Sequence, residues 1–242
     1  MRYGFFGLAI AGLIAAATYI GGQSTTPSVS TLIADLYAAG DAEGIVERLA
    51  PGTVGAEQLE NFRFGVEQEL GSGAQIVSTD QVTAQGATFT RSESSSGIQW
   101  CVGPGDSVYI LCRIGAAAVT GAVEGAPLEV AAANAEIFVD ASAISVILIT
   151  DDPEGYTLDG ELELVGSDGS PVDATMTESL FISGGQPFPA DPADLQLPPG
   201  VGLLLSFEGS PEPGTLTGRS LTLRWANGEV ALEVSEPELF LG

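Results

Sequence analysis

The chain of 242 residues is long enough for one large domain or two small ones, and its 45% hydrophobic and 16% charged residues are typical of a folded protein. Its 32 acidic residues far outnumber its seven arginines, and the net charge of −25 argues against nucleic-acid binding. Histidine and lysine are absent, which excludes Ser-His-Asp catalysis, histidine metal sites and Schiff-base chemistry and leaves carboxylate chemistry or none.

An uncharged apolar run occupies residues 3–20, directly after Met1 and Arg2. As a helix it would span about 27 Å, close to the roughly 30 Å of a hydrocarbon core. The preceding arginine and the acidic chain that follows orient the C-terminal part outward. We therefore predict a signal anchor or a cleaved signal peptide at residues 1–22 and a tether at 23–30. The protein is then either held in the cell membrane with an extracytoplasmic C-terminal region or secreted.

Helical patterns follow the tether. Helices are predicted at residues 32–38, 42–49 and 56–70. Ser30 or Thr31 is expected to cap the first helix and Asp41 the second. The third helix places its apolar residues on one stripe, formed by Leu59, Phe62, Val66 and Leu70. Strands are then predicted at residues 74–78, 81–90, 97–102 and 107–114.

Residues 32–54 read LIADLYAAGDAEGIVERLAPGTV. This stretch resembles the opening helices of the nuclear transport factor 2-like superfamily, in particular the small domains of bacterial exported proteins. The resemblance covers about residues 28–115 and implies a curved sheet wrapped around helices, a cone that in some members holds a ligand. Enzymatic members of the family often use an Asp-His arrangement that this chain lacks. We therefore expect an α+β, cone-like domain at residues 31–115 without an implied activity.

Four aromatic residues of this domain are candidates for a ligand pocket between the helices and the sheet. They are Phe62, Phe64, Trp100 and Tyr109. Packing in an ordinary core explains the same residues, because large aromatic side chains dominate cores as well as binding sites. An apolar cavity would favour ligand binding, whereas a filled core would argue against it.

Cys101 and Cys112 flank the turn sequence Gly103-Pro104-Gly105-Asp106 between two predicted strands. If the connecting loop runs over residues 105–108, the two cysteines lie directly opposite each other. In an oxidising compartment we expect a structural disulfide, because a redox pair needs closer spacing and electropositive surroundings.

The rest of the chain is predicted to be all-β. Residues 116–127 are expected to form an interdomain linker or to extend a strand, and residues 128–242 an immunoglobulin-like sandwich. Strands are predicted at residues 128–132, 135–139, 144–150, 161–165, 174–183, 202–207, 220–225 and 230–234. Residues 184–200 read as a long Pro-rich loop, which is either functional or a plain crossover.

The last hairpin has a predicted register. Asn227-Gly228 is typical of a two-residue type I′ turn. The pairs that follow are Trp225–Val230, Leu223–Leu232 and Leu221–Val234. This register puts every apolar residue on one face, and a slip by one residue would destroy that agreement.

The densest acidic stretch lies between residues 151 and 163. Asp151, Asp152 and Glu154 are candidate ligands for calcium, which prefers carboxylate and carbonyl oxygens on a loop. A solvated polar face is the alternative, because the Asp-x-Asp-x-Asp-Gly pattern is absent. The same acids are the candidates for a glycosidase-type carboxylate pair.

Together these patterns predict an α+β protein: an N-terminal membrane helix, a small helix-plus-curved-antiparallel-sheet domain, and an all-β immunoglobulin-like sandwich. We expect a non-enzymatic binding or scaffolding protein without a resident cofactor, whose acidic sandwich binds a protein partner on the cell surface. One alternative is the binding of an apolar small molecule in the cone of the first domain. Another is a carboxylate-dependent hydrolase with two acids facing each other across a cleft.

Overall fold

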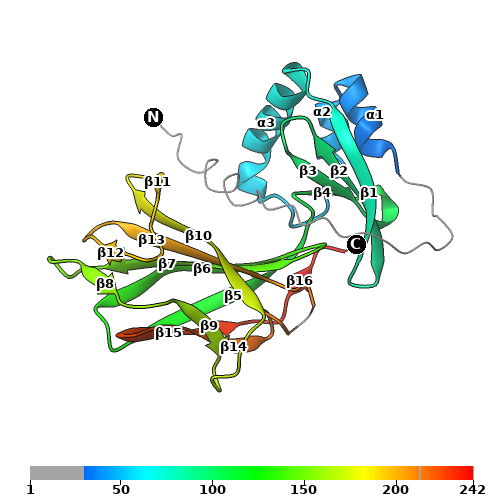
Figure 1. Ribbon diagram of the computed structural model, residues 1–242. Coiled ribbons are helices and arrows are strands. Elements are labelled where there is room, and N and C mark those ends of the chain that lie inside the picture. Colours follow the sequence, from blue (N-terminus) through cyan, green and yellow to red (C-terminus); the bar gives the residue numbers. More distant parts are fainter. Residues whose placement is uncertain (1–29, 213, 242) are drawn as a thin grey trace. The chain divides into compact units, whose positions relative to one another are not determined.

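The computed structural model describes residues 30–212 and 214–241, which divide into two compact units (Figure 1). The helix-containing unit comprises residues 30–116, 137–140 and 238–241, and the β-rich unit comprises residues 117–136 and 141–237. The described chain is mostly β, with antiparallel strands and a few helices. No helix in these residues is long and apolar enough to cross a membrane. The predicted signal segment, and the predicted tether apart from Ser30, lie outside them.

The helices of the helix-containing unit follow the predicted hydrophobic pattern. They are α1 (Leu32–Ala39), α2 (Ala42–Val46), the short 3-10 turn η1 (Ala56–Gln58) and α3 (Leu59–Gly71). The predicted cap of α2 is confirmed, because the Asp41 carboxylate accepts a hydrogen bond of 2.9 Å from the Gly44 N–H. The start of α1 differs: the Thr31 hydroxyl donates to Asp35, and Ser30 Oγ accepts from the Leu32 N–H at 3.3 Å.

A four-stranded antiparallel sheet follows the helices in the order β1-β2-β3-β4. Its elements are β1 (Ile76–Ala84), β2 (Ala87–Ser94), β3 (Gln99–Val102), the 3-10 turn η2 (Pro104–Asp106) and β4 (Val108–Ile110). The single strand predicted at residues 81–90 is wrong, since a hairpin turn divides it. Gln85 and Gly86 both have positive φ, 50° and 75°, and two such residues reverse the chain tightly between twisted strands.

Both faces of this sheet are covered, because successive residues of a strand point to opposite sides. On one face Trp100 and Val108 pack with Phe62 and Val66 of α3 and with residues of α1 and α2. On the other face Tyr109 joins a cluster with further buried residues. These are Ala50, Ala84, Phe89, Cys101, Cys112, Ile114, Ile137 and Val139. The sheet is therefore the middle layer of the unit.

The β-rich unit is built on one curled antiparallel sheet rather than on two separate sheets. The strand order is β11-β10-β13-β7-β6-β5-β15-β14-β9, and β16 adds to β5 within the helix-containing unit. The strands are β5 (Arg113–Glu124), β6 (Leu128–Phe138), β7 (Ser142–Thr150), β9 (Glu163–Gly166), β10 (Ala174–Ser183), β11 (Gln186–Pro189), β13 (Gly202–Gly209), β14 (Arg219–Trp225), β15 (Gly228–Val234) and β16 (Glu238–Leu239). A separate pair joins β8 (Tyr156–Leu158) to β12 (Leu195–Leu197).

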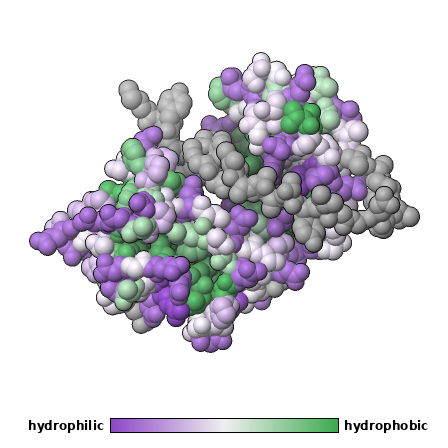
Figure 2. All heavy atoms as spheres, in the orientation of Figure 1, coloured by the Kyte–Doolittle hydropathy of each residue, from purple (hydrophilic) through white to green (hydrophobic). Residues whose placement is uncertain are grey.

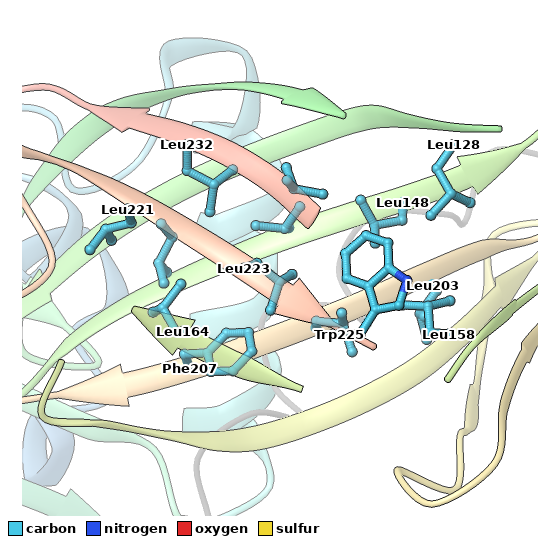
Figure 3. Close-up of a cluster of buried hydrophobic side chains, with 14 of the residues drawn as sticks. Leu128, Leu148, Leu158, Leu164, Leu203, Phe207, Leu221, Leu223, Trp225 and Leu232 are labelled. Carbon is cyan, nitrogen blue, oxygen red and sulfur yellow. The ribbon is translucent and has the colours of Figure 1, made fainter. Parts of the chain in front are cut away.

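The curl brings the two ends of the sheet face to face over one aliphatic core. Leu148 of β7 and Leu203 of β13 lie on one side of that core, and Leu223 of β14 and Leu232 of β15 on the other (Figure 3). All four are fully buried. A sheet folded on itself thus buries every second residue of its strands, as two packed sheets would. The alternating sequence pattern is the same in both cases, so it does not tell one curled sheet from two sheets.

Two predicted loops contain strands. Residues 116–127, predicted as a linker or as the extension of a strand, are largely β5, in which Val119, Gly121 and Val123 pair with β15. Small residues such as Gly121 fit in β5 because side chains of the neighbouring strands, Val130 and Leu232, occupy the adjacent space. Residues 184–200, the predicted Pro-rich loop, contain β11 and β12. Leu195 and Leu197 of β12 are buried in the core, and their two-residue spacing matches a strand.

The last hairpin keeps the predicted face but not the predicted pairs. The observed partners are Trp225–Gly228, Leu223–Val230 and Leu221–Leu232. Each partner has moved by two residues, which preserves the apolar face because strand side chains alternate with a period of two. The turn is held by Asn227, whose amide nitrogen donates to the Thr157 carbonyl at 3.0 Å and whose amide oxygen accepts from the Asp159 N–H at 3.2 Å.

Candidate functional site

The four residues predicted to line a pocket in the helix-containing unit do not share a cavity. Phe62 and Trp100 pack edge to face in the core beneath the helices, with ring centroids 6.2 Å apart. Tyr109 belongs to the cluster on the opposite face of the sheet. Phe64 is 61% exposed on the outside of α3. Phe62, Trp100 and Tyr109 therefore act as core packing, whereas Phe64 is not part of the core.

The polar atoms of Trp100 and Tyr37 in this core form a hydrogen bond with each other. The Trp100 indole nitrogen donates a hydrogen bond of 2.8 Å to the Tyr37 hydroxyl, and the two rings lie edge to face. Burial raises the pKa of Tyr37 to about 12, although the hydrogen bond from Trp100 acts in the opposite direction. A buried neutral phenol with its partner inside the core stabilises the fold and offers no group to a substrate.

Cys101 and Cys112 form the expected disulfide, with Cα atoms 4.8 Å apart, but they are not opposite each other on a hairpin. Cys101 of β3 pairs with Tyr109 of β4, and Cys112 lies in the turn after β4. Leu111 and Cys112 both have left-handed backbone conformations, with φ of 53° and 55°. The disulfide and the hydrogen bond from the Val139 N–H to the Cys112 carbonyl hold this unfavourable turn in place.

The candidate calcium ligands Asp151, Asp152 and Glu154 do not converge. No group of three or more acidic or cysteine side chains in the described residues is placed to hold a metal ion. The Asp152 carboxylate instead accepts a hydrogen bond of 2.9 Å from the Glu154 N–H. This hydrogen bond closes a local turn, in which Asp151 and Glu154 are exposed.

A cavity of about 870 Å³ opens on the side of the β-rich unit, between β9 and β10. Its floor is apolar and consists of Leu162, Leu164, Val172, Ala174, Met176 and Phe207. Leu164 and Phe207 are also members of the central core, so the core reaches the floor here (Figure 3). In Figure 2 hydrophobic surface, bordered by hydrophilic residues, is visible in the area of β9 and β10. We call this cavity the lateral groove.

The lateral groove exists because the curled sheet does not close. β9 is the last strand of the sheet, with β14 on one side and an isolated bridge between Val165 and Pro171 on the other. β11 pairs with β10 only over Leu180 to Ser183. Within the described residues, the part of β10 at residues 174–178 therefore has a neighbouring strand, β13, on one side only. Two strand edges thus border an apolar floor, an arrangement that can accept an extended segment.

The rim of the lateral groove is acidic. Glu163 accepts hydrogen bonds of 2.9 and 2.6 Å from the Nε and Nη2 atoms of Arg224, and both side chains are half exposed. Glu161 is fully on the surface beside them. Hydrogen bonds from the Ser170 side chain and backbone lower the pKa of Asp168, an exposed residue outside the lining of the groove. Burial raises the pKa of Glu178 on β10.

The lateral groove was not predicted from the sequence, although the sequence contains two signals for it. Leu162 and Leu164 alternate with Glu161 and Glu163, and the run from Val172 to Met176 is apolar at every second residue. Both patterns predict strands with one buried face. They do not tell whether that face is covered by another strand, because this depends on how far the sheet curls.

Comparisons with protein-family models, with curated proteins and with solved structures gave no match to this chain.

Proposed function

We propose that the protein is an extracytoplasmic, non-enzymatic binding protein, and that its β-rich unit holds an extended segment of a partner protein in the lateral groove. The observation that carries this proposal is the apolar floor between two strand edges, on β9 and on residues 174–178 of β10. The proposal develops the expectation, drawn from the sequence, that the acidic β-rich part of the chain binds a protein partner.

The floor supports binding because four of its six apolar side chains are only partly covered. Leu162, Val172, Ala174 and Met176 are half-buried and pack against the central core from its open side. A strand laid between β9 and β10 would cover them, and each fully buried side chain of this size contributes roughly 1.5–3 kcal/mol. Backbone hydrogen bonds to the edges would add affinity, and the floor would select the side chains.

We propose a non-enzymatic function because of the positions of the acidic residues. The acidic residues that line the lateral groove are Glu161 and Glu163, which are two positions apart in the sequence and lie on the same side of the groove. Glycosidase chemistry needs two carboxyl groups on opposite sides of the scissile bond. Glu163 is moreover neutralised by Arg224. The arrangement suits recognition better than hydrolysis.

In this proposal the other parts of the chain present the groove. The apolar residues 3–20 would hold the protein at the membrane as a signal anchor, or be removed on export. The helix-containing unit would act as a rigid module of the nuclear transport factor 2-like type. Helices followed by antiparallel strands, in the order that the resemblance implies, support that assignment.

The experiment uses the chain from Gln23 onward and a phage library of random short peptides. Peptides are selected on the wild type and then measured against two variants by fluorescence anisotropy. Met176→Asp puts a charge on the floor and should weaken binding at least about tenfold, because it removes the burial of one apolar side chain. Phe188→Asp, an exposed apolar residue of the same unit outside the groove, should leave binding unchanged.

Stability is the control for this comparison. Met176 is half-buried at the edge of the core, so Met176→Asp should change the free energy of unfolding by no more than about 1 kcal/mol. Peptides that bind the Met176→Asp variant as tightly as the wild type, or a library from which none is enriched, would overturn the proposal.

A further inference from the structure

We propose that the segment bound in the lateral groove is cationic, with lysine or arginine side chains placed next to apolar ones at a two-residue spacing. The inference rests on the proposed function and names the chemistry of the partner. It follows from three features: the charge of the β-rich unit, the geometry of the rim, and the repulsion that excludes a second copy of this chain.

The β-rich unit is strongly acidic. Arg219 and Arg224 are its only basic residues, whereas 19 of its residues are Asp or Glu. The guanidinium of Arg224 already forms an ion pair with Glu163. A partner that approaches the groove therefore meets a negative potential, which attracts a basic segment and speeds its association.

The carboxylates of the rim have the same two-residue spacing as the basic side chains of an extended segment in which basic and apolar residues alternate. Glu161 and Glu163 alternate with Leu162 and Leu164, so the carboxylates stand at the rim while the leucines form the floor. Glu161 makes no hydrogen bond or ion pair within the described residues. An extended segment beside β9 that places apolar side chains on the floor would bring every second residue to the rim. A basic residue at those positions faces a carboxylate, and opposite charges at neighbouring positions of paired strands are stabilising.

A second copy of this chain is a poor occupant. Each copy carries a net charge of −25, and pairing through an acidic rim would add the repulsion of two such charges. A neutral or acidic segment would also leave Glu161 next to apolar side chains without a counter-charge. A cationic segment from a different protein resolves both problems.

The test begins with the composition of the peptides that the wild type enriches and the Met176→Asp variant does not. We expect these peptides to be enriched in lysine and arginine alternating with apolar residues. One such peptide is then measured against Glu161→Lys, which should weaken binding roughly three- to tenfold at low salt, less as ionic strength rises. Glu154→Lys is the matched control, since it changes the net charge equally on an exposed turn outside the groove. It should leave affinity within about twofold.

The outcomes separate the two proposals. Neutral or acidic peptides that need Met176 would mean that the groove binds extended segments but that the inference about charge is wrong. Equal losses in Glu161→Lys and Glu154→Lys would mean that net charge, and not the rim, attracts the peptide, which also overturns it. If no peptide distinguishes wild type from Met176→Asp, the groove is not a binding site and both proposals fall.

Discussion

The two units bury their hydrophobic side chains in different ways. The helix-containing unit fills its core with aromatic rings, Tyr37, Phe62 and Trp100 on one face of the sheet and Phe89 and Tyr109 on the other. The β-rich unit has a mainly aliphatic core, whose edge is exposed between β9 and β10. In the helix-containing unit the large buried side chains pack against each other inside the unit. In the β-rich unit some core residues also line the lateral groove.

The two cores suggest different roles for the two units. A closed core with internal hydrogen bonds and a disulfide confers stability, and the exposed apolar residues of its unit, Phe64 and Val77, lie outside that core. A core that reaches the surface at an unclosed sheet leaves apolar area in contact with water, and such area commonly marks a binding site. Substitutions in the first unit should therefore affect mainly stability, and substitutions in the lateral groove mainly binding.

The largest expected effect is that of Trp100→Ala. The substitution empties the space between Tyr37 and Phe62 and removes the hydrogen bond to the Tyr37 hydroxyl. We expect the free energy of unfolding to fall by about 3–5 kcal/mol, measured by urea denaturation. A loss under about 1 kcal/mol, the size expected of Met176→Asp in the groove, would break the contrast between a closed and an open core.

Removal of the disulfide should have the next largest effect. The double substitution Cys101→Ala and Cys112→Ala opens a loop with a sequence separation of 11 and releases the left-handed turn at Leu111. We expect a loss of about 2–3 kcal/mol in the free energy of unfolding. Wild-type protein in reducing buffer should unfold at the same urea concentration as the variant, and peptide binding in the groove should persist at temperatures where both remain folded.

The smallest effect concerns alkaline pH. Burial raises the pKa of Tyr37 from 10.0 to about 12, so the folded state favours the neutral phenol. The stabilisation is fully present below about pH 10, and it is lost as pH rises towards 12, because the unfolded chain releases its proton first. Unfolding measured across this window should show a steeper decline in wild type than in Tyr37→Phe. Burial also raises the pKa of Tyr109, which keeps some slope in the variant. Parallel curves would contradict the prediction.

Local features were predictable from the sequence because their causes are local. The three helices follow apolar spacing and the Asp41 cap, and β10 begins and ends at the predicted residues 174 and 183. The alternation of Trp225, Leu223 and Leu221 predicted the buried face of the last hairpin. Its pairs were wrong by two residues, because contacts of Asn227 with Thr157 and Asp159, far away in sequence, decide where the turn lies.

The sequence by itself therefore determined the three helices, most of the strands with their apolar faces, and that two cysteines close together along the chain would bond. Only the tertiary structure decided that the β-rich unit is one curled sheet and that this sheet stops short of closing. It likewise decided that Leu162 and Met176 line a groove while Trp100 is sealed in a core. The physical reason is that alternation specifies which face of a strand is buried, whereas the partner that covers the face depends on the twist and curl of all the strands together.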